Sequence, residues 1–170
     1  MTDSLRADER QAKLYDLIKD VKFAMFTTHH PHGHLHSRPM TTRNEAIDED
    51  DALWFFMSRS GGPVAEFQGD DQVNVSYSSP DDGTYVSISG IAHVIEDDAK
   101  KHVLWKDADK AWFAGGVDDP DLALVRIDIE HADYWDVTTN KVVRLYEMAK
   151  AALGGKPTRP GTEHARVRPH

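Results

Sequence analysis

Seven short segments with strand-like patterns constrain the fold of this chain more than any other feature. They are rich in β-branched and aromatic residues, and clusters of Pro, Gly, Asp and Asn bound them. The segments are residues 23–28, 35–42, 52–57, 72–77, 85–94, 122–129 and 132–136. Six or more short strands with helices only at the periphery predict a mainly β (α+β) fold built on an antiparallel barrel.

Helical periodicity occurs only outside these segments. Leu14, Leu17, Ile18 and Val21 have the spacing of one helix face. We predict helices over residues 4–22, 63–68, 99–105, 107–113 and 141–153. There is no internal repeat, so we expect one domain over residues 1–153 and a flexible tail over residues 154–170, which holds three prolines and three glycines.

Composition narrows the partners. The 20 basic and 29 acidic residues give a net charge of −9, which disfavours nucleic acid and anionic membranes as partners. The absence of cysteine excludes disulfides and thiolate metal sites. No apolar run approaches the ~20 residues that span a bilayer, and residues 1–9 lack the pattern of a signal peptide. We therefore expect a cytoplasmic protein.

One arginine and one turn form a candidate anion site. Arg38 lies on the predicted strand 35–42, and the turn Ser58–Gly62 leads directly into a helix that begins near Pro63. Free amides and the positive end of the helix dipole favour an anion there, and Arg38 or Arg59 could pair with phosphate oxygens. The alternative is an ordinary β-turn with a helix cap.

Histidines cluster in one hairpin. His29, His30, His32, His34 and His36 fall within eight residues, but Pro31 and Gly33 interrupt regular alternation. No nearby carboxylate completes a ligand set, and there is no HExxH motif. We therefore expect loop histidines and no metal site.

Aromatic residues mark a second candidate region. Trp105, Trp112 and Phe113 lie in a polar stretch, where they serve either as core or interface residues or as stacking partners of a planar ligand. The chain has no GxSxG, GxGxxG or Walker A motif and no recognisable acid–base pair, so the catalytic residues stay unknown.

Several stretches together resemble one protein family. They are HSRPM (36–40), LWFF (53–56), VNVSY (73–77), YVSISG (85–90), WFAGGVDDPDL (112–122) and ADYWD (132–136). In order and spacing they resemble the general stress proteins of the pyridoxamine 5′-phosphate oxidase-like, FMN-binding split-barrel superfamily. The likeness runs from about residue 8 to residue 153.

The resemblance implies a split-barrel homodimer with a flavin, FMN or possibly FAD, at the subunit interface. Arg38 would bind the phosphate, Phe56 would follow the ribityl chain and ring edge, and the tryptophans would contact flavin from the partner subunit. The full set of implied and predicted flavin-binding residues is Arg38, Pro39, Met40, Thr41, Phe56, Met57, Ser58, Arg59, Ser60, Gly61, Gly62, Trp105 and Trp112.

The chain departs from the family at the phosphate end. Many relatives carry a serine and a lysine where this chain has Gly61 and Pro63. A lost charge-assisted contact of ~1.5–3 kcal/mol weakens binding by about 10–100-fold. We therefore expect reversible flavin binding.

The fold does not choose the reaction. The leading hypothesis is a flavin-binding general stress protein, with a flavin-dependent reductase as one activity. A true pyridoxamine phosphate oxidase is disfavoured, because the second basic cluster that its substrate requires is missing. The alternative is a flavin or tetrapyrrole carrier or sensor without turnover.

Overall fold

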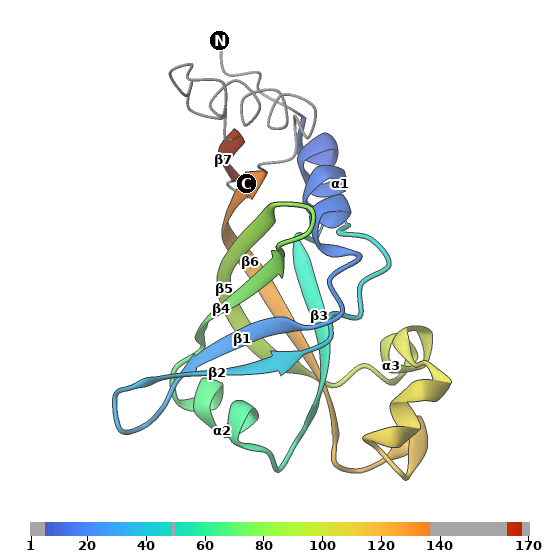
Figure 1. The fold of residues 1–170 in the computed structure, drawn as a ribbon. Coiled ribbons are helices and arrows are strands. Elements are labelled where there is room, and N and C mark those ends of the chain that lie inside the picture. The colour runs from blue at the N-terminus through green and yellow to red at the C-terminus, as the bar shows by residue number, and fades with distance from the viewer. Residues whose placement is uncertain (1–5, 49, 137–162, 168–170) are drawn as a thin grey trace, which may run out of the picture.

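The computed structural model describes residues 6–48, 50–136 and 163–167 (Figure 1). The helices are α1 (Ala7–Ile18), α2 (Gly62–Gly69), α3 (Asp98–Leu104) and the 3-10 helices η1 (Asp107–Ala111) and η2 (Gly116–Asp118). The strands are β1 (Ala24–His29), β2 (Leu35–Met40), β3 (Ala52–Ser58), β4 (Gln72–Ser79), β5 (Thr84–Ile95), β6 (Leu122–Asp136) and β7 (Glu163–Val167). No helix in these ranges is long and apolar enough to cross a membrane.

The strands form one curled antiparallel sheet in the order β2-β1-β4-β5-β6-β3. An isolated bridge between Thr42 and Phe55 connects the chain beyond β2 with β3, at the opposite end of this order. The sheet therefore curls into a barrel with helices at its periphery (Figure 1), and the fold predicted from the sequence is confirmed. Pro39 lies on the outermost strand, where its missing N–H costs no ladder bond.

The barrel interior is the main hydrophobic core. Phe26 lies at its centre and makes edge contacts with Phe55 and Phe67, at ring distances of 5.6 and 6.5 Å. Phe67 comes from α2, and Leu14 and Ile18 of α1 join the same core. These two helices cover the barrel because each has an apolar stripe to bury.

Strand β3 is buried on both faces, as its continuous apolar sequence indicates. Leu53, Phe55 and Met57 face the main core. Trp54 and Phe56 face a second cluster outside the barrel. The buried residues of that cluster are Ala52, Trp54, Phe56, Leu104, Phe113, Leu122 and Leu124. The segment of α3 and η1 thus packs against the outer side of β3 and β6.

Strand β6 is one long strand, whereas the sequence pattern predicts two. Its pairing with β5 shifts between Ser89 and Gly90, and Glu130 is the extra residue of the bulge. The bulge breaks the alternation of side chains without ending the strand. Gly90 is needed there, because a Cβ on it would lie 2.1 Å from the carbonyl oxygen of Asp128.

Strand β7 pairs with β6 beyond the stretch that β3 occupies. Its five residues lie within residues 154–170, the segment predicted as a flexible tail. The rest of that tail and the helix predicted over residues 141–153 lie outside the described residues.

Candidate functional site

A cleft of about 520 Å³ lies outside the barrel, between the edge strand β2, the end of β3 and the segment after η1. The residues that line it are Phe23, Pro39, Met40, Thr41, Arg43, Phe56, Met57, Ser58, Trp112 and Phe113. Most of these side chains are apolar or aromatic, as is typical of pockets for planar ligands.

Local sequence explains two walls of the cleft. Residues 39–41 end the edge strand, where Pro39 prevents pairing with a further strand through its nitrogen. Phe56 points away from the barrel interior because side chains alternate along β3. The cleft thus forms where the end of an edge strand meets the outer face of a buried strand.

Arg43 brings a positive charge to this apolar cleft. Its guanidinium lies over the ring of Phe56 and pairs with the carboxylate of Asp109, which is only 2% exposed. Asp109 also accepts a hydrogen bond from the backbone N–H of Lys106 at 2.9 Å, which fixes η1. The Nε of Arg43 is the only buried side-chain nitrogen or oxygen without a hydrogen-bond partner in the described part of the chain.

The tryptophans occupy different positions. Trp112 lines the cleft and is 78% exposed, whereas its neighbour Phe113 is buried. Trp105 does not line the cleft but packs on Phe56 from behind, at a ring distance of 6.1 Å. The structure therefore places Trp112 at the mouth of the cleft, whereas Trp105 packs against Phe56, one of the lining residues.

Arg38 lies at the end of the barrel that α2 covers. Its Nη2 donates to Oε2 of Glu66 at 2.5 Å, and its Nη1 donates to Oγ1 of Thr28 at 2.9 Å. Thr28 also donates to the Glu66 carboxylate, and Nδ1 of His36 lies 3.2 Å from Oε1 of Glu66. Arg38 and Glu66 thus form a largely buried ion pair, with side-chain exposures of 14% and 7%.

The Glu66 carboxylate lies near the beginning of its own helix. A side chain at i+4 points back towards the helix N-terminus, and Oε1 of Glu66 would lie 3.9 Å from a Cβ on Gly62. Burial acts to raise the pKa of Glu66, but the hydrogen bonds from Thr28, Arg38 and His36 outweigh it and lower the pKa to about 2. The carboxylate is therefore ionised at neutral pH.

The bend between β3 and α2 is held by another carboxylate. Asp121 accepts hydrogen bonds from Oγ of Ser58 at 2.5 Å and from the backbone N–H of Ser60 at 2.9 Å. The hydrogen bond from Ser58 is the main cause of the lowered pKa of Asp121. Arg59 pairs with Glu96 at 2.8 Å.

The structure brings together about half of the predicted site. The predicted residues in the cleft are Pro39, Met40, Thr41, Phe56, Met57, Ser58 and Trp112. Those that do not line it are Arg38, Arg59, Ser60, Gly61, Gly62 and Trp105.

The sequence predictions missed the roles of Phe23 and Arg43 in the wall, and that of Glu66 beside Arg38. Only Glu66 had a usable signal. Its position four residues after Gly62 places its carboxylate at the predicted helix start.

The histidine hairpin lies apart from the cleft lining. His30 stacks on His34 at a ring distance of 4.3 Å, and His29 pairs with Asp70 at 3.1 Å. Among the residues that the structure describes, no three His, Asp or Glu side chains are arranged to hold a metal ion.

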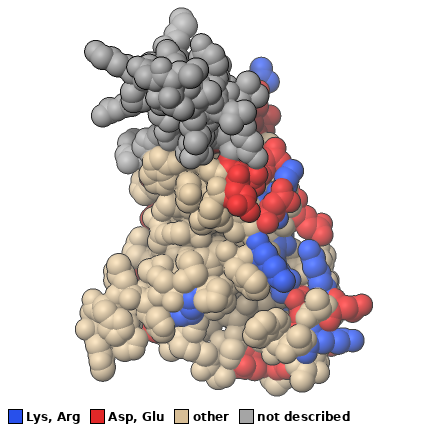
Figure 2. Space-filling view, in the orientation of Figure 1, with Lys and Arg blue, Asp and Glu red and all other residues tan. Residues whose placement is uncertain are grey.

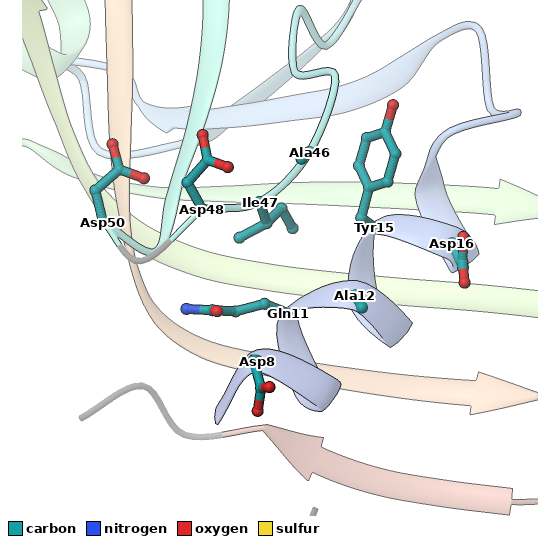
Figure 3. A pocket seen from close by; sticks show the side chains of 9 residues that line it. All are labelled: Asp8, Gln11, Ala12, Tyr15, Asp16, Ala46, Ile47, Asp48 and Asp50. Atoms are coloured by element: carbon teal, nitrogen blue, oxygen red, sulfur yellow. The ribbon is translucent and has the colours of Figure 1, made fainter. Parts of the chain in front are cut away.

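A second hollow, of about 660 Å³, lies between α1 and the loop before β3 (Figure 3). Asp8 and Asp16 line it from the helix, and Asp48 and Asp50 line it from the loop. No basic side chain is among its described lining residues. Its charge disfavours an anionic ligand such as FMN, so the cleft beside Pro39 is the stronger candidate.

Comparison with known sequences gives one family. A model of the pyridoxamine 5′-phosphate oxidase like family matches residues 9–158 of the chain. The protein bli-3 of Neurospora crassa is 29% identical over 164 residues, which cover 88% of this chain and 76% of that protein.

Solved structures share the fold. A protein from Jannaschia sp. CCS1 that bears the name general stress protein 26 aligns with a TM-score of 0.73 and 24% identity, covering 91% of this chain and 94% of its own. The general stress FMN/FAD binding protein from Xanthomonas citri aligns with a TM-score of 0.64 and 32% identity, covering 74% of this chain and 87% of its own.

Proposed function

The chain belongs to the pyridoxamine 5′-phosphate oxidase-like family, and we propose that it is a flavin-binding protein whose cleft holds the ring system of FMN. The observation that carries the proposal is the composition of the cleft. Both segments that the family resemblance assigns to the flavin, residues 39–41 and 56–58, line the same cavity. The relative from Xanthomonas citri, named for FMN and FAD binding, supports the same ligand class.

The residues of the cleft fit a flavin ring. The cavity of about 520 Å³ falls within the range of pockets for small ligands and cofactors. Phe56, Phe113 and Trp112 offer flat apolar surfaces, and the buried Nε–H of Arg43 offers a donor for a ring oxygen or nitrogen. A bound flavin would supply the electron chemistry, and these residues would position it.

We further propose that a second copy of the chain covers the open side of the cleft. Eight of the outward residues on four adjacent strands are Met25, Thr27, Ser37, Pro39, Asn74, Ser76, Ser87 and Ser89. None of the eight is charged, although 29% of the whole chain is. Figure 2 shows this largely uncharged surface over β1 and β2, with the acidic and basic residues gathered towards α1 and α3.

This surface has the composition of an interface centre, where charged residues are depleted. Pro39 belongs both to it and to the cleft. A homodimer through this sheet face would therefore place the partner beside the flavin.

Reduction of an external substrate fits the cleft better than oxidation of pyridoxamine phosphate. Arg43 is the only basic residue among the described lining residues, and it is already paired with Asp109. A phosphorylated substrate would lack the basic cluster that it needs.

The second candidate is a flavin carrier without turnover. One observation favours it, because Arg43 is also the only ionisable residue in the described lining and is too basic to transfer protons.

Titration of the protein with FMN and with FAD tests the proposal, with quenching of flavin fluorescence as the measure of binding. We expect saturable binding of one FMN per chain, and weaker binding by Trp112→Ala because an aromatic contact at the mouth is lost. Val103→Ala is the matched control, since Val103 is 71% exposed and does not line the cleft. Absence of saturable binding by the wild-type protein would refute flavin binding.

An oxidation assay with NADH and NADPH then separates the two candidates. Turnover by the flavin-loaded protein with an external acceptor supports the reductase. Binding without turnover supports the carrier.

A further inference from the structure

The guanidinium predicted to bind a phosphate is already bound to a carboxylate of the chain. Nη2 of Arg38 donates to Glu66 at 2.5 Å, and Nη1 donates to Thr28, which itself donates to Glu66. These three side chains and His36 form one network in which Glu66 is the only anion. The side chain of Glu66 is 7% exposed.

The same carboxylate lies near the start of α2. Oε1 of Glu66 is the nearest atom to a Cβ built on Gly62, at 3.9 Å, and Gly62 is the first residue of that helix. Free amides and the helix dipole favour negative charge at this point. Glu66, which lies four residues after the first residue of α2, is therefore the anion that Arg38 meets.

The neighbouring donors are also paired with carboxylates. Arg59 pairs with Glu96, and the hydroxyl of Ser58 and the amide of Ser60 donate to Asp121. A terminal phosphate dianion entering this region would have to displace a carboxylate, or bind next to one at a cost in repulsion. A neutral ribityl chain that ends in a hydroxyl meets no such repulsion.

From this arrangement we infer that Glu66 is a specificity-determining residue, which holds the anion position and removes most of the preference for FMN over riboflavin. The inference rests on the proposed flavin function. It predicts that the ring and ribityl chain supply most of the binding, whereas the phosphate supplies little.

The experiment compares the dissociation constants of FMN and riboflavin for the wild-type protein, Glu66→Gln and Asp70→Asn. Gln keeps the shape and hydrogen-bonding oxygen of Glu66 but removes its charge. Asp70→Asn removes the same charge directly after α2, where Asp70 pairs with His29 and not with Arg38. Circular dichroism confirms that each variant is folded at the temperature of the titration.

We expect the wild-type protein to bind FMN and riboflavin with affinities within about tenfold of each other. Glu66→Gln should bind FMN at least about tenfold more tightly than the wild type does, because Arg38 becomes free for a charge-assisted bond with the phosphate. Its affinity for riboflavin should equal that of the wild type. Adding Arg38→Ala to Glu66→Gln should abolish this gain. Asp70→Asn should leave the ratio of the two affinities as in the wild type.

If the wild-type protein binds FMN more than about tenfold more tightly than riboflavin, the inference is overturned. This measurement needs no variant. An equal gain for both flavins in Glu66→Gln, or the same gain in Asp70→Asn, would also overturn it. In all these cases flavin binding itself stands. Failure of the wild type and the variants to bind either flavin would instead refute the proposed function.

Discussion

The guanidinium carbon of Arg43 lies 5.2 Å from the centroid of the Phe56 ring, so a cation and an aromatic ring form one wall of the cleft. The contact is set by a partner distant in sequence, because Asp109 of η1 holds the guanidinium from the other side. The segment that carries Trp112 and Phe113 is thereby tied to β3. The shape of the cleft depends on this ion pair.

Asp109→Asn should destabilise the protein by about 3 kcal/mol, because it leaves a largely buried arginine without its counter-charge. It should also weaken flavin binding, since η1 and Trp112 lose their anchor. Urea unfolding and flavin titration measure the two effects. Asp107→Asn is the control on the same 3-10 helix, where the exposed side chain should contribute less than about 0.5 kcal/mol. Equal destabilisation by both variants would show that the Arg43–Asp109 pair contributes nothing specific.

The elements with local sequence signals could be predicted. The hairpin of β1 and β2 follows from the turn at Gly33, strand β3 from its apolar and aromatic run, and the helix after Gly61 from Pro63. Each of these signals acts within a few residues. The start of α3 also depends on a local contact, since Asp97 accepts a hydrogen bond from the backbone N–H of Lys100 at 2.9 Å. The barrel as a whole was predictable because such local signals agree with one another.

The charge pairs could not be predicted, because the partners are far apart in the chain. Arg38 and Glu66 are separated by 28 residues, and Arg43 and Asp109 by 66. Only the folded sheet brings them together, and no pattern in the sequence fixes which acid meets which base. The sequence pattern predicts two strands where β6 is one, because the bulge at Glu130 interrupts the alternation. The pairing with β5 that continues through the bulge is again a contact between distant residues.

Acid should remove part of the stability of the protein through Glu66. Its pKa is about 2 in the folded protein against an ordinary value of 4.5, so ionised Glu66 stabilises the folded state at neutral pH. This contribution is fully present above the ordinary pKa and is lost as pH falls from 4.5 towards 2. The groups that face the carboxylate are Thr28, His36 and Arg38.

The midpoint of urea unfolding at pH 7 and pH 3 checks this expectation. The wild-type protein should lose more stability between the two pH values than Glu66→Gln, which has no carboxylate to protonate at this position. Identical losses in the two proteins would mean that Glu66 is not held in its ionised form by the fold.

Gly90→Ala should destabilise the protein by about 3 kcal/mol or more, because the new methyl group would overlap a backbone carbonyl that cannot move alone. The built Cβ lies 2.1 Å from the carbonyl oxygen of Asp128, across the pairing of β5 and β6. Gly69→Ala is the control, since a Cβ there meets no atom within 4 Å among the described residues. Thermal unfolding of both variants tests the role of the bulge, and a cost for Gly90→Ala no greater than that for Gly69→Ala would contradict it.

Ser76→Lys should convert the proposed homodimer into a monomer. Ser76 lies in the middle of the uncharged sheet face, paired with Met25 on one side and Ser87 on the other. A lysine there would be buried without a counter-charge in the interface, at a cost of several kcal/mol. Analytical ultracentrifugation should give twice the chain mass of 19.1 kDa for the wild type and 19.1 kDa for the variant. Gln68→Lys, which adds the same charge at an exposed position of α2, should stay dimeric because it lies off that face. A wild-type protein that sediments as a monomer would exclude the dimer, and flavin binding by that monomer would show that the cleft is complete within one chain.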